Sequence, residues 1–237
     1  MMTFKKRSNQ EELMDNLNLD KRILKLALKD ISRVNKLLGG NNITINAIEN
    51  IINKNPKAHY KITDIGCGSG AMLREVATYC RKKKYNVSLV GIDMNTNSLD
   101  IAEEFSEDFP EIRYKNLNIF QAKPKDIETD ILLCTLTLHH FTTADINRFI
   151  AAFVSITTKA IIINDLQRSR LAYLLFHVFS RIFLKTQLAR IDGLISIKRG
   201  FIKQDLQHIS NTLKASSSIQ WKWAFRYLWV IKPNKTI

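Results

Sequence analysis

The sequence is most constrained by residues 61–71, where an apolar segment runs into three closely spaced glycines, Gly66, Gly68 and Gly70. The apolar segment is typical of a buried strand, and residues 72–79 continue with the pattern of a helix. Glycines at these positions let the backbone turn sharply and approach a nucleotide-like ligand closely. The stretch therefore predicts a strand, a tight loop and a helix start that together form a binding site.

Asp64 precedes the glycines and indicates which ligand fits them. The spacing Gly66-x-Gly68-x-x-Ala71 also satisfies the dinucleotide-binding fingerprint, so the glycines alone leave two ligand classes open. A carboxylate at the end of the strand would repel a pyrophosphate and attract an ammonium group. We therefore favour a phosphate-free ligand that carries a positive charge, and a nicotinamide oxidoreductase is the weakest alternative.

Residues 64–70, Asp-Ile-Gly-Cys-Gly-Ser-Gly, resemble motif I of the class I S-adenosylmethionine-dependent methyltransferases. The resemblance implies S-adenosylmethionine as the cofactor, with Asp93 accepting hydrogen bonds from its ribose hydroxyls and Met94 against its adenine. Asn118 and Ile119 stand where the family has an acidic and a small residue, and Asn118 can still accept from the adenine amino group. The cofactor-binding residues implied are Asp64, Gly66, Cys67, Gly68, Gly70, Asp93, Met94, Asn118, Ile119 and Thr135.

After Pro56 the sequence alternates between strand and helix patterns. We expect strands at residues 60–65, 87–93, 112–117, 131–136 and 160–164, and a closing hairpin at residues 217–223 and 225–231. The predicted fold is α/β: the Rossmann-like class I methyltransferase sheet of seven strands, mostly parallel, with a C-terminal antiparallel hairpin. Ligands should bind outside the carboxyl ends of the parallel strands.

Two helical regions flank this pattern. Residues 1–55 are expected to form an N-terminal helical cap, with helices within residues 9–38 and 43–52, and residues 56–237 the methyltransferase domain. A helical insertion is expected at about residues 166–215, after the fifth strand. The cap either gates the acceptor or simply covers one edge of the sheet.

A histidine pair follows the strand at 131–136. The segment Leu-His-His-Phe at 138–141 resembles small-molecule methyltransferases related to the ubiquinone and menaquinone biosynthetic enzymes. A phenolic acceptor has a pKa near 10, so a base poised near neutrality would assist methyl transfer to it. His139 or His140 is the candidate base and Asp165 its orienting partner. The alternative is that the histidines only pack beneath the cofactor.

The insertion suggests the acceptor. Residues 171–184 are strongly apolar, and polar groups within apolar surroundings at 164–168 and 189–196 resemble methyltransferases found with bacterial type III polyketide synthases. The resemblance implies a lipophilic, phenolic or polyketide-derived acceptor and a role in secondary metabolism. The candidate acceptor residues are Arg168, His177, Arg190 and Asp192, with capping and surface ion pairing as equal alternatives.

The net positive charge of the chain leaves nucleic acid and membrane surfaces open as partners. The chain has 36 Lys and Arg against 22 Asp and Glu, a formal net charge of +14, but the basic residues are dispersed along the sequence. An RNA ribose methyltransferase and a cofactor-binding protein without turnover are the alternative functions. The apolar segment at 171–184, with Lys198, Arg199 and Lys203, would also suit a peripheral contact with an anionic membrane.

The cysteines and the N-terminus indicate the compartment. Cys67, Cys80 and Cys134 have no metal-ligand spacing, so we expect no metal site and a reducing cytoplasm. The N-terminus lacks the apolar core of a signal peptide, and no apolar run reaches the length of a membrane span. Nothing in the sequence indicates an oligomeric state.

Overall fold

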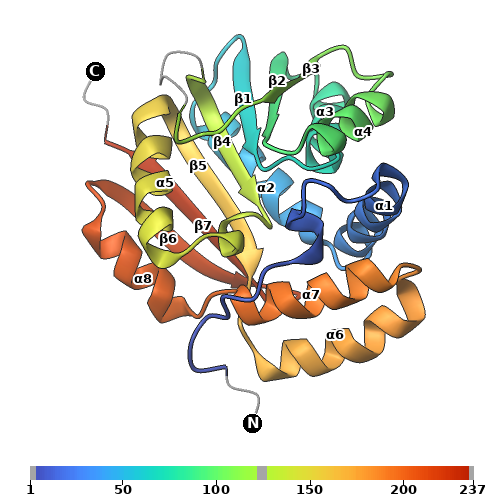
Figure 1. Ribbon diagram of the computed structural model, residues 1–237. Coiled ribbons are helices and arrows are strands. Elements are labelled where there is room, and N and C mark those ends of the chain that lie inside the picture. Colours follow the sequence, from blue (N-terminus) through green and yellow to red (C-terminus); the bar gives the residue numbers. More distant parts are fainter. Residues whose placement is uncertain (1–3, 122–126, 235–237) are drawn as a thin grey trace.

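The computed structural model describes residues 4–121 and 127–234 and is built on a sheet of seven strands in the order β3-β2-β1-β4-β5-β7-β6 (Figure 1). The strands are β1 (Tyr60–Ile65), β2 (Val87–Asp93), β3 (Ile112–Asn116), β4 (Thr129–Thr135), β5 (Thr157–Leu166), β6 (Ala215–Lys222) and β7 (Arg226–Pro233). Strands β1 to β5 pair in parallel, whereas β7 pairs antiparallel with β5 and β6. The predicted fold class is confirmed, including its C-terminal hairpin.

Helices cover both faces of the sheet. On one face lie α2 (Gly40–Lys54) and α3 (Ala71–Lys83), and on the other α5 (Thr143–Ile156) and α8 (Lys203–Thr212), while α4 (Thr96–Phe105) packs beside β3. Successive strand residues alternate between the two cores, so Leu133 joins the α2 and α3 side and Leu132 the α5 and α8 side. Helices therefore cover both faces of the sheet, and a ligand can reach the sheet only at the ends of its strands.

The insertion after β5 places its first two helices beyond the tips of the parallel strands, as Figure 1 shows. It contains α6 (Arg170–Phe183) and α7 (Gln187–Arg199), which pack against each other, and then α8. Ser169 and Thr186 cap the first two helices by accepting bonds from the backbone of Ala172 and Ala189. Within the described residues no helix is long and apolar enough to cross a membrane.

The N-terminal region differs from the expectation of helices from residue 9. Helix α1 (Lys21–Leu37) begins only after Asp20, whose carboxylate caps it by accepting from the N–H groups of Arg22 and Ile23. We call residues 4–20 the N-terminal strap: it is mostly extended, with one short 3-10 turn at Leu13–Asp15. The strap crosses the carboxyl ends of the strands next to α7 (Figure 1).

Candidate functional site

The loop after β1 has the backbone that the three glycines predict. Gly66, Gly68 and Gly70 have φ angles of 69°, 51° and 69°, in the left-handed region that favours glycine. At Gly66 an added Cβ would also lie 2.2 Å from Cγ2 of Thr137. The loop is fastened from the next strand, because the N–H of Gly68 donates to Oδ2 of Asp93 at 2.9 Å. At Gly66, glycine is thus required both for its φ angle and for lack of space.

Asp64 and Asp93 end neighbouring strands beside this loop. Asp64 is only 2% exposed, and its Oδ1 has no hydrogen-bond partner. Burial, and secondarily the negative charge of Asp93, raise the pKa of Asp64 well above its ordinary value. Burial also raises the pKa of Asp93, although bonds from the Asn95 and Gly68 N–H groups oppose this. An unpartnered buried carboxylate oxygen of this kind fits a cationic ligand group.

These residues line a cavity of about 830 Å³. Much of the remaining lining is apolar and comes from the helices outside the sheet, with Leu28, which lies beside Gly68, and Ile31 from α1, and Leu175, Phe176 and Phe179 from α6. The volume lies within the range of pockets that hold a cofactor or a drug-sized ligand. One chamber therefore joins a polar, glycine-lined end to an apolar end.

The structure brings most of the predicted cofactor and catalytic residues to this chamber. Ten of them line it: Asp64, Gly66, Cys67, Gly68, Asp93, Met94, Ile119, Thr135, His139 and His140. Three others lie outside the lining. Gly70 is the residue before α3, the Asn118 carboxamide accepts from the N–H of Phe120, and Asp165 lies behind His139.

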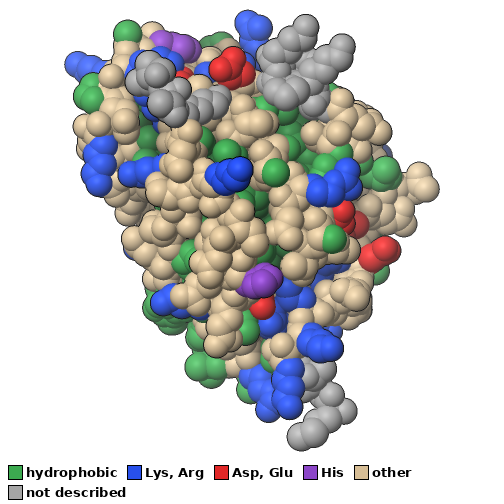
Figure 2. Space-filling view, turned by 90° about the vertical axis from the view of Figure 1, so that its left-hand side faces the viewer, with side chains coloured by type: hydrophobic (Ala, Val, Ile, Leu, Met, Phe, Trp, Pro, Cys, Tyr) green, Lys and Arg blue, Asp and Glu red, His purple; other side chains and the backbone are tan. Residues whose placement is uncertain are grey.

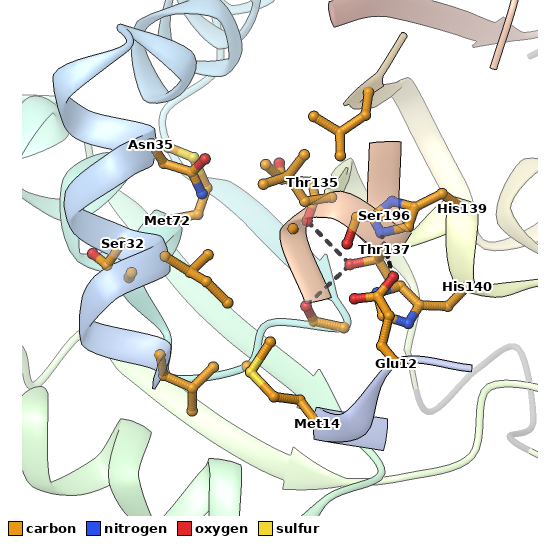
Figure 3. Close-up of a pocket in the computed structure, with 18 of the residues that line it drawn as sticks. Glu12, Met14, Ser32, Asn35, Met72, Thr135, Thr137, His139, His140 and Ser196 are labelled. Carbon is orange, nitrogen blue, oxygen red and sulfur yellow. Dashed lines mark hydrogen bonds and ion pairs between the residues drawn. The ribbon is translucent and has the colours of Figure 1, made fainter. Parts of the chain in front are cut away.

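The two histidines occupy a short 3-10 turn, Leu138–His140. They meet two acidic residues of the strap, Glu12, which Figure 3 shows beside them, and Asp15. His139 is 2% exposed; its Nδ1 lies 2.7 Å from Oδ1 of Asp165, and its Nε2 lies 3.3 Å from Oε1 of Glu12. His140 places Nδ1 3.0 Å from Oδ1 of Asp15 and Nε2 3.7 Å from Oε2 of Glu12. We call Glu12, His139 and His140 the histidine cluster.

Neighbouring carboxylates change the expected chemistry of His139. Burial alone would lower the pKa of this imidazole, but Asp165 and Glu12 together raise it to about 10. The two carboxylates therefore favour the doubly protonated form of His139, which opposes the role of free base predicted from the sequence.

Sequence reasoning missed Glu12 and Asp15. Both precede the histidines by more than a hundred residues, and no spacing pattern connects them. The available signal was the acidic character of residues 11–15 within a basic N-terminus. The strap is held in place because Arg7 donates to the carbonyls of His139 and Phe141, and the carboxylate of Asp192 accepts from the N–H groups of Leu13 and Met14.

Comparison with known proteins identifies the domain. Residues 62–159 match the family described as "Methyltransferase domain". This part of the chain is similar to a methyltransferase domain, and the sheet around it has the class I methyltransferase fold. This match covers β1 to the start of β5, including the glycine loop and the histidines, and it confirms the predicted cofactor, S-adenosylmethionine. A search of curated protein sequences finds no match.

Solved structures share the fold of the whole chain. The plantazolicin methyltransferase BpumL in complex with SAH superposes with a TM-score of 0.64 at 13% identity, covering 93% of this chain and 98% of that chain. Magnesium protoporphyrin IX methyltransferase (ChlM) from Synechocystis PCC 6803 with bound SAM gives a TM-score of 0.56 at 14% identity, covering 88% and 84%. The CurJ carbon methyltransferase gives 0.59 at 14% identity, covering 82% and 54%. At such identities the likeness extends to the fold alone.

The four acceptor candidates of the methyltransferase insertion do not line the chamber. Arg168 is buried and donates to the carbonyl of Gly200 and to Asp205, and Arg190 donates to the carbonyl of Leu184. Asp192 binds the strap, as described above, and His177 lies on α6 outside the lining. The described contacts of the two arginines and of Asp192 are thus with the protein itself, which is the capping alternative left open by the sequence.

Proposed function

We propose that this methyltransferase transfers the methyl group of S-adenosylmethionine to a hydroxyl group of a lipophilic, aromatic or polyketide-derived small molecule. The observation that carries the proposal is the continuous chamber, with the glycine loop at one end, apolar helices at the other and the histidine cluster on its wall. A hydroxyl acceptor is favoured because this cluster supplies polar groups that bind and activate an O–H group.

The chain's own residues fit the cofactor at the polar end. The unpartnered Oδ1 of Asp64 would accept from the ammonium group, and the Asp93 carboxylate would face the ribose. S-adenosylmethionine supplies an activated methyl group on a sulfonium, so the leaving thioether is neutral and requires no acid. Most of the rate enhancement would then come from alignment of the acceptor oxygen with the methyl group in a site that excludes water.

The apolar end supports a lipophilic acceptor. Leu24, Leu28 and Ile31 of α1 face the same chamber as Phe176 and Phe179 of α6, and such walls would bind hydrocarbon or aromatic groups by burial. An RNA substrate is less favoured, because the chamber is apolar and the Lys and Arg side chains on the face in Figure 2 are scattered.

The outer face of α6 suggests where such an acceptor comes from. Leu171, Leu174, Leu175, Val178 and Ile182 recur at helical spacing and are exposed, with Leu174 62% and Ile182 70% exposed. We call these five residues the α6 stripe. Residues 166–191 contain basic side chains but neither Asp nor Glu, which complements an anionic lipid surface.

The α6 stripe is continuous with the chamber. Leu175 belongs to the stripe and also lines the chamber, together with the exposed Trp223. Arg199, which the sequence suggested for this contact, is instead buried and donates to the carbonyl of Gln10. We therefore propose that α6 rests on an anionic membrane, with Arg170, Arg181 and Lys185 at the headgroups, and that the acceptor enters from the lipid.

The proposed activity is tested by calorimetry with SAH followed by methylation assays. We expect SAH to bind, and labelled methyl groups from S-adenosylmethionine to appear on phenolic acceptors with alkyl chains. Binding of SAH without transfer to any small acceptor would favour a cofactor-binding protein without turnover. Transfer to structured RNA in preference to lipophilic phenols would favour the RNA alternative.

A further inference from the structure

We propose that the histidine cluster, Glu12, His139 and His140, binds a divalent transition-metal ion on the wall of the chamber. The proposal rests on the proposed function, because the ion would activate the acceptor hydroxyl within the same site. It revises the expectation, drawn from the cysteine spacing, that the protein has no metal site.

The ligand atoms converge. One ligand atom from each of the three residues lies within 4.8 Å of the other two, and Figure 3 shows the three side chains pointing toward one another. Oε1 of Glu12 and Nε2 of His139 face each other as an ion pair 3.3 Å apart, and both atoms are buried without a hydrogen bond. A metal ion in place of the proton between them would bind both buried atoms at once. Two imidazoles and one carboxylate are a ligand set typical of divalent transition metals.

The surrounding carboxylates orient both imidazoles as metal sites require. Asp165 lies 2.7 Å from Nδ1 of His139, and Asp15 lies 3.0 Å from Nδ1 of His140. With the Nδ1 protons donated to these carboxylates, the Nε2 lone pairs of both rings face Glu12. This carboxylate–histidine arrangement is the usual support of histidine metal ligands.

The local charges also suit a cation. Three carboxylates, those of Glu12, Asp15 and Asp165, surround the two imidazoles. The guanidinium groups of Arg7 and Arg199 donate to backbone carbonyls nearby, and Arg199 also lies 3.9 Å from Oδ2 of Asp15, so the two arginines leave one of the three negative charges uncompensated. A divalent ion would compensate the excess negative charge that neutral histidines leave. Because Glu12, His139 and His140 all line the chamber, an ion that they held would be open to a ligand from the chamber.

An open position facing the chamber gives the ion a chemical role. An acceptor hydroxyl bound there would lose its proton to solvent water more readily, because the ion stabilises the resulting oxyanion. This oxygen would then form a bond to the methyl carbon as the carbon–sulfur bond breaks and its electron pair stays on sulfur. The group that activates the acceptor is thus the metal-bearing cluster rather than a free imidazole.

The test is metal binding by the full-length chain, measured apart from activity. Protein freed of metal with a chelator is titrated with Zn²⁺ by calorimetry and with Co²⁺ by visible absorption, and SAH binding is measured on the same samples. We expect uptake of about one equivalent, as for a dedicated site. Glu12→Gln and the His139→Ala/His140→Ala variant should lose this uptake, and Glu12→Gln should still bind SAH.

Two further variants sharpen the result. Asp165→Asn should weaken Zn²⁺ binding by about 10- to 100-fold, the usual effect of removing a carboxylate that supports a histidine ligand. His208→Ala removes an exposed histidine of α8 and is the matched control; it should bind Zn²⁺ as the parent protein does. The proposal is overturned if the parent binds SAH but takes up neither ion, or if Glu12→Gln retains full uptake. Loss of SAH binding in the parent would instead contradict the proposed function.

Discussion

The two ends of the chamber are built in different ways. At the cofactor end, the glycine loop, Asp64 and Asp93 lie within thirty residues of one another, on two paired strands that the sequence pattern defines. At the acceptor end, the histidine cluster joins the strap to the turn after β4, and α1 faces α6. The cofactor end is thus set by local backbone requirements, whereas the acceptor end depends on contacts between distant segments. Substitutions at one end should therefore change cofactor affinity or acceptor turnover without changing the other.

The largest effect is expected from Gly66→Ala. The added methyl group would collide with Thr137. Alanine would also have to adopt the left-handed φ of 69° that glycine has at this position. We expect the Kd for SAH to rise by at least about a hundredfold, equivalent to about 2.8 kcal/mol. Gly39→Ala is the matched control, because Gly39 has the same φ but open space around it. Gly39→Ala should lower the stability of the fold and leave the affinity for SAH unchanged. Equal losses of SAH affinity in both variants would contradict an effect of the clash with Thr137.

Glu12→Gln should affect the other end alone. It removes the charge that joins the two histidines, so we expect kcat to fall by about a hundredfold, within the range for loss of an activating group. The Kd for SAH should stay unchanged. Glu11→Gln, at the exposed neighbouring position, is the control in the same kinetic assay. A parallel loss of SAH affinity in Glu12→Gln would show that the two ends are not separable.

Leu174→Asp tests whether the acceptor end extends to a lipid surface. Placing a charge on the α6 stripe removes the burial of one leucine, worth about 1.5–3 kcal/mol, and we expect co-sedimentation with phosphatidylglycerol vesicles to fall about tenfold or more. Leu37→Asp, at a comparably exposed leucine on α1, should have no effect. Binding to neutral phosphatidylcholine vesicles as strong as to phosphatidylglycerol would contradict the role of the basic residues. Dimer formation that Leu174→Asp abolishes would identify a second copy as the partner.

The smallest effect concerns pH at the cofactor end. The pKa of Asp64 is raised by burial, and a bound ammonium group would lower it again, so binding should release a proton. SAH affinity should therefore rise with pH up to the pKa of the free protein and then level off, with a change below about tenfold per pH unit. Calorimetry in buffers of different ionisation heat measures this proton. Asp64→Asn should abolish the release, and a release that persists would assign it to another group.

Sequence patterns predicted the sheet and the cofactor end because their causes are local. Alternating strands and helices, the glycines and the acidic strand ends each follow from requirements of the neighbouring backbone. The prediction of helix from residue 9 was wrong for the strap, because the helical spacing begins only at Leu24 and the strap is held instead by long-range bonds from Arg7 and to Asp192. Arg168 and Asp192 were assigned to the acceptor for a related reason: a buried polar group in an apolar segment serves a backbone partner as readily as a ligand.

The strap has a practical consequence for anyone shortening or tagging this protein. Four of its residues, Glu12, Met14, Asp15 and Leu17, line the chamber although they precede the first strand by more than forty positions. A truncation beginning at Asp20 would keep the cap of α1, the sheet and the cofactor loop, yet it would remove Glu12 and Asp15 and open one side of the chamber. Such a fragment would look well folded and still bind SAH while being catalytically silent.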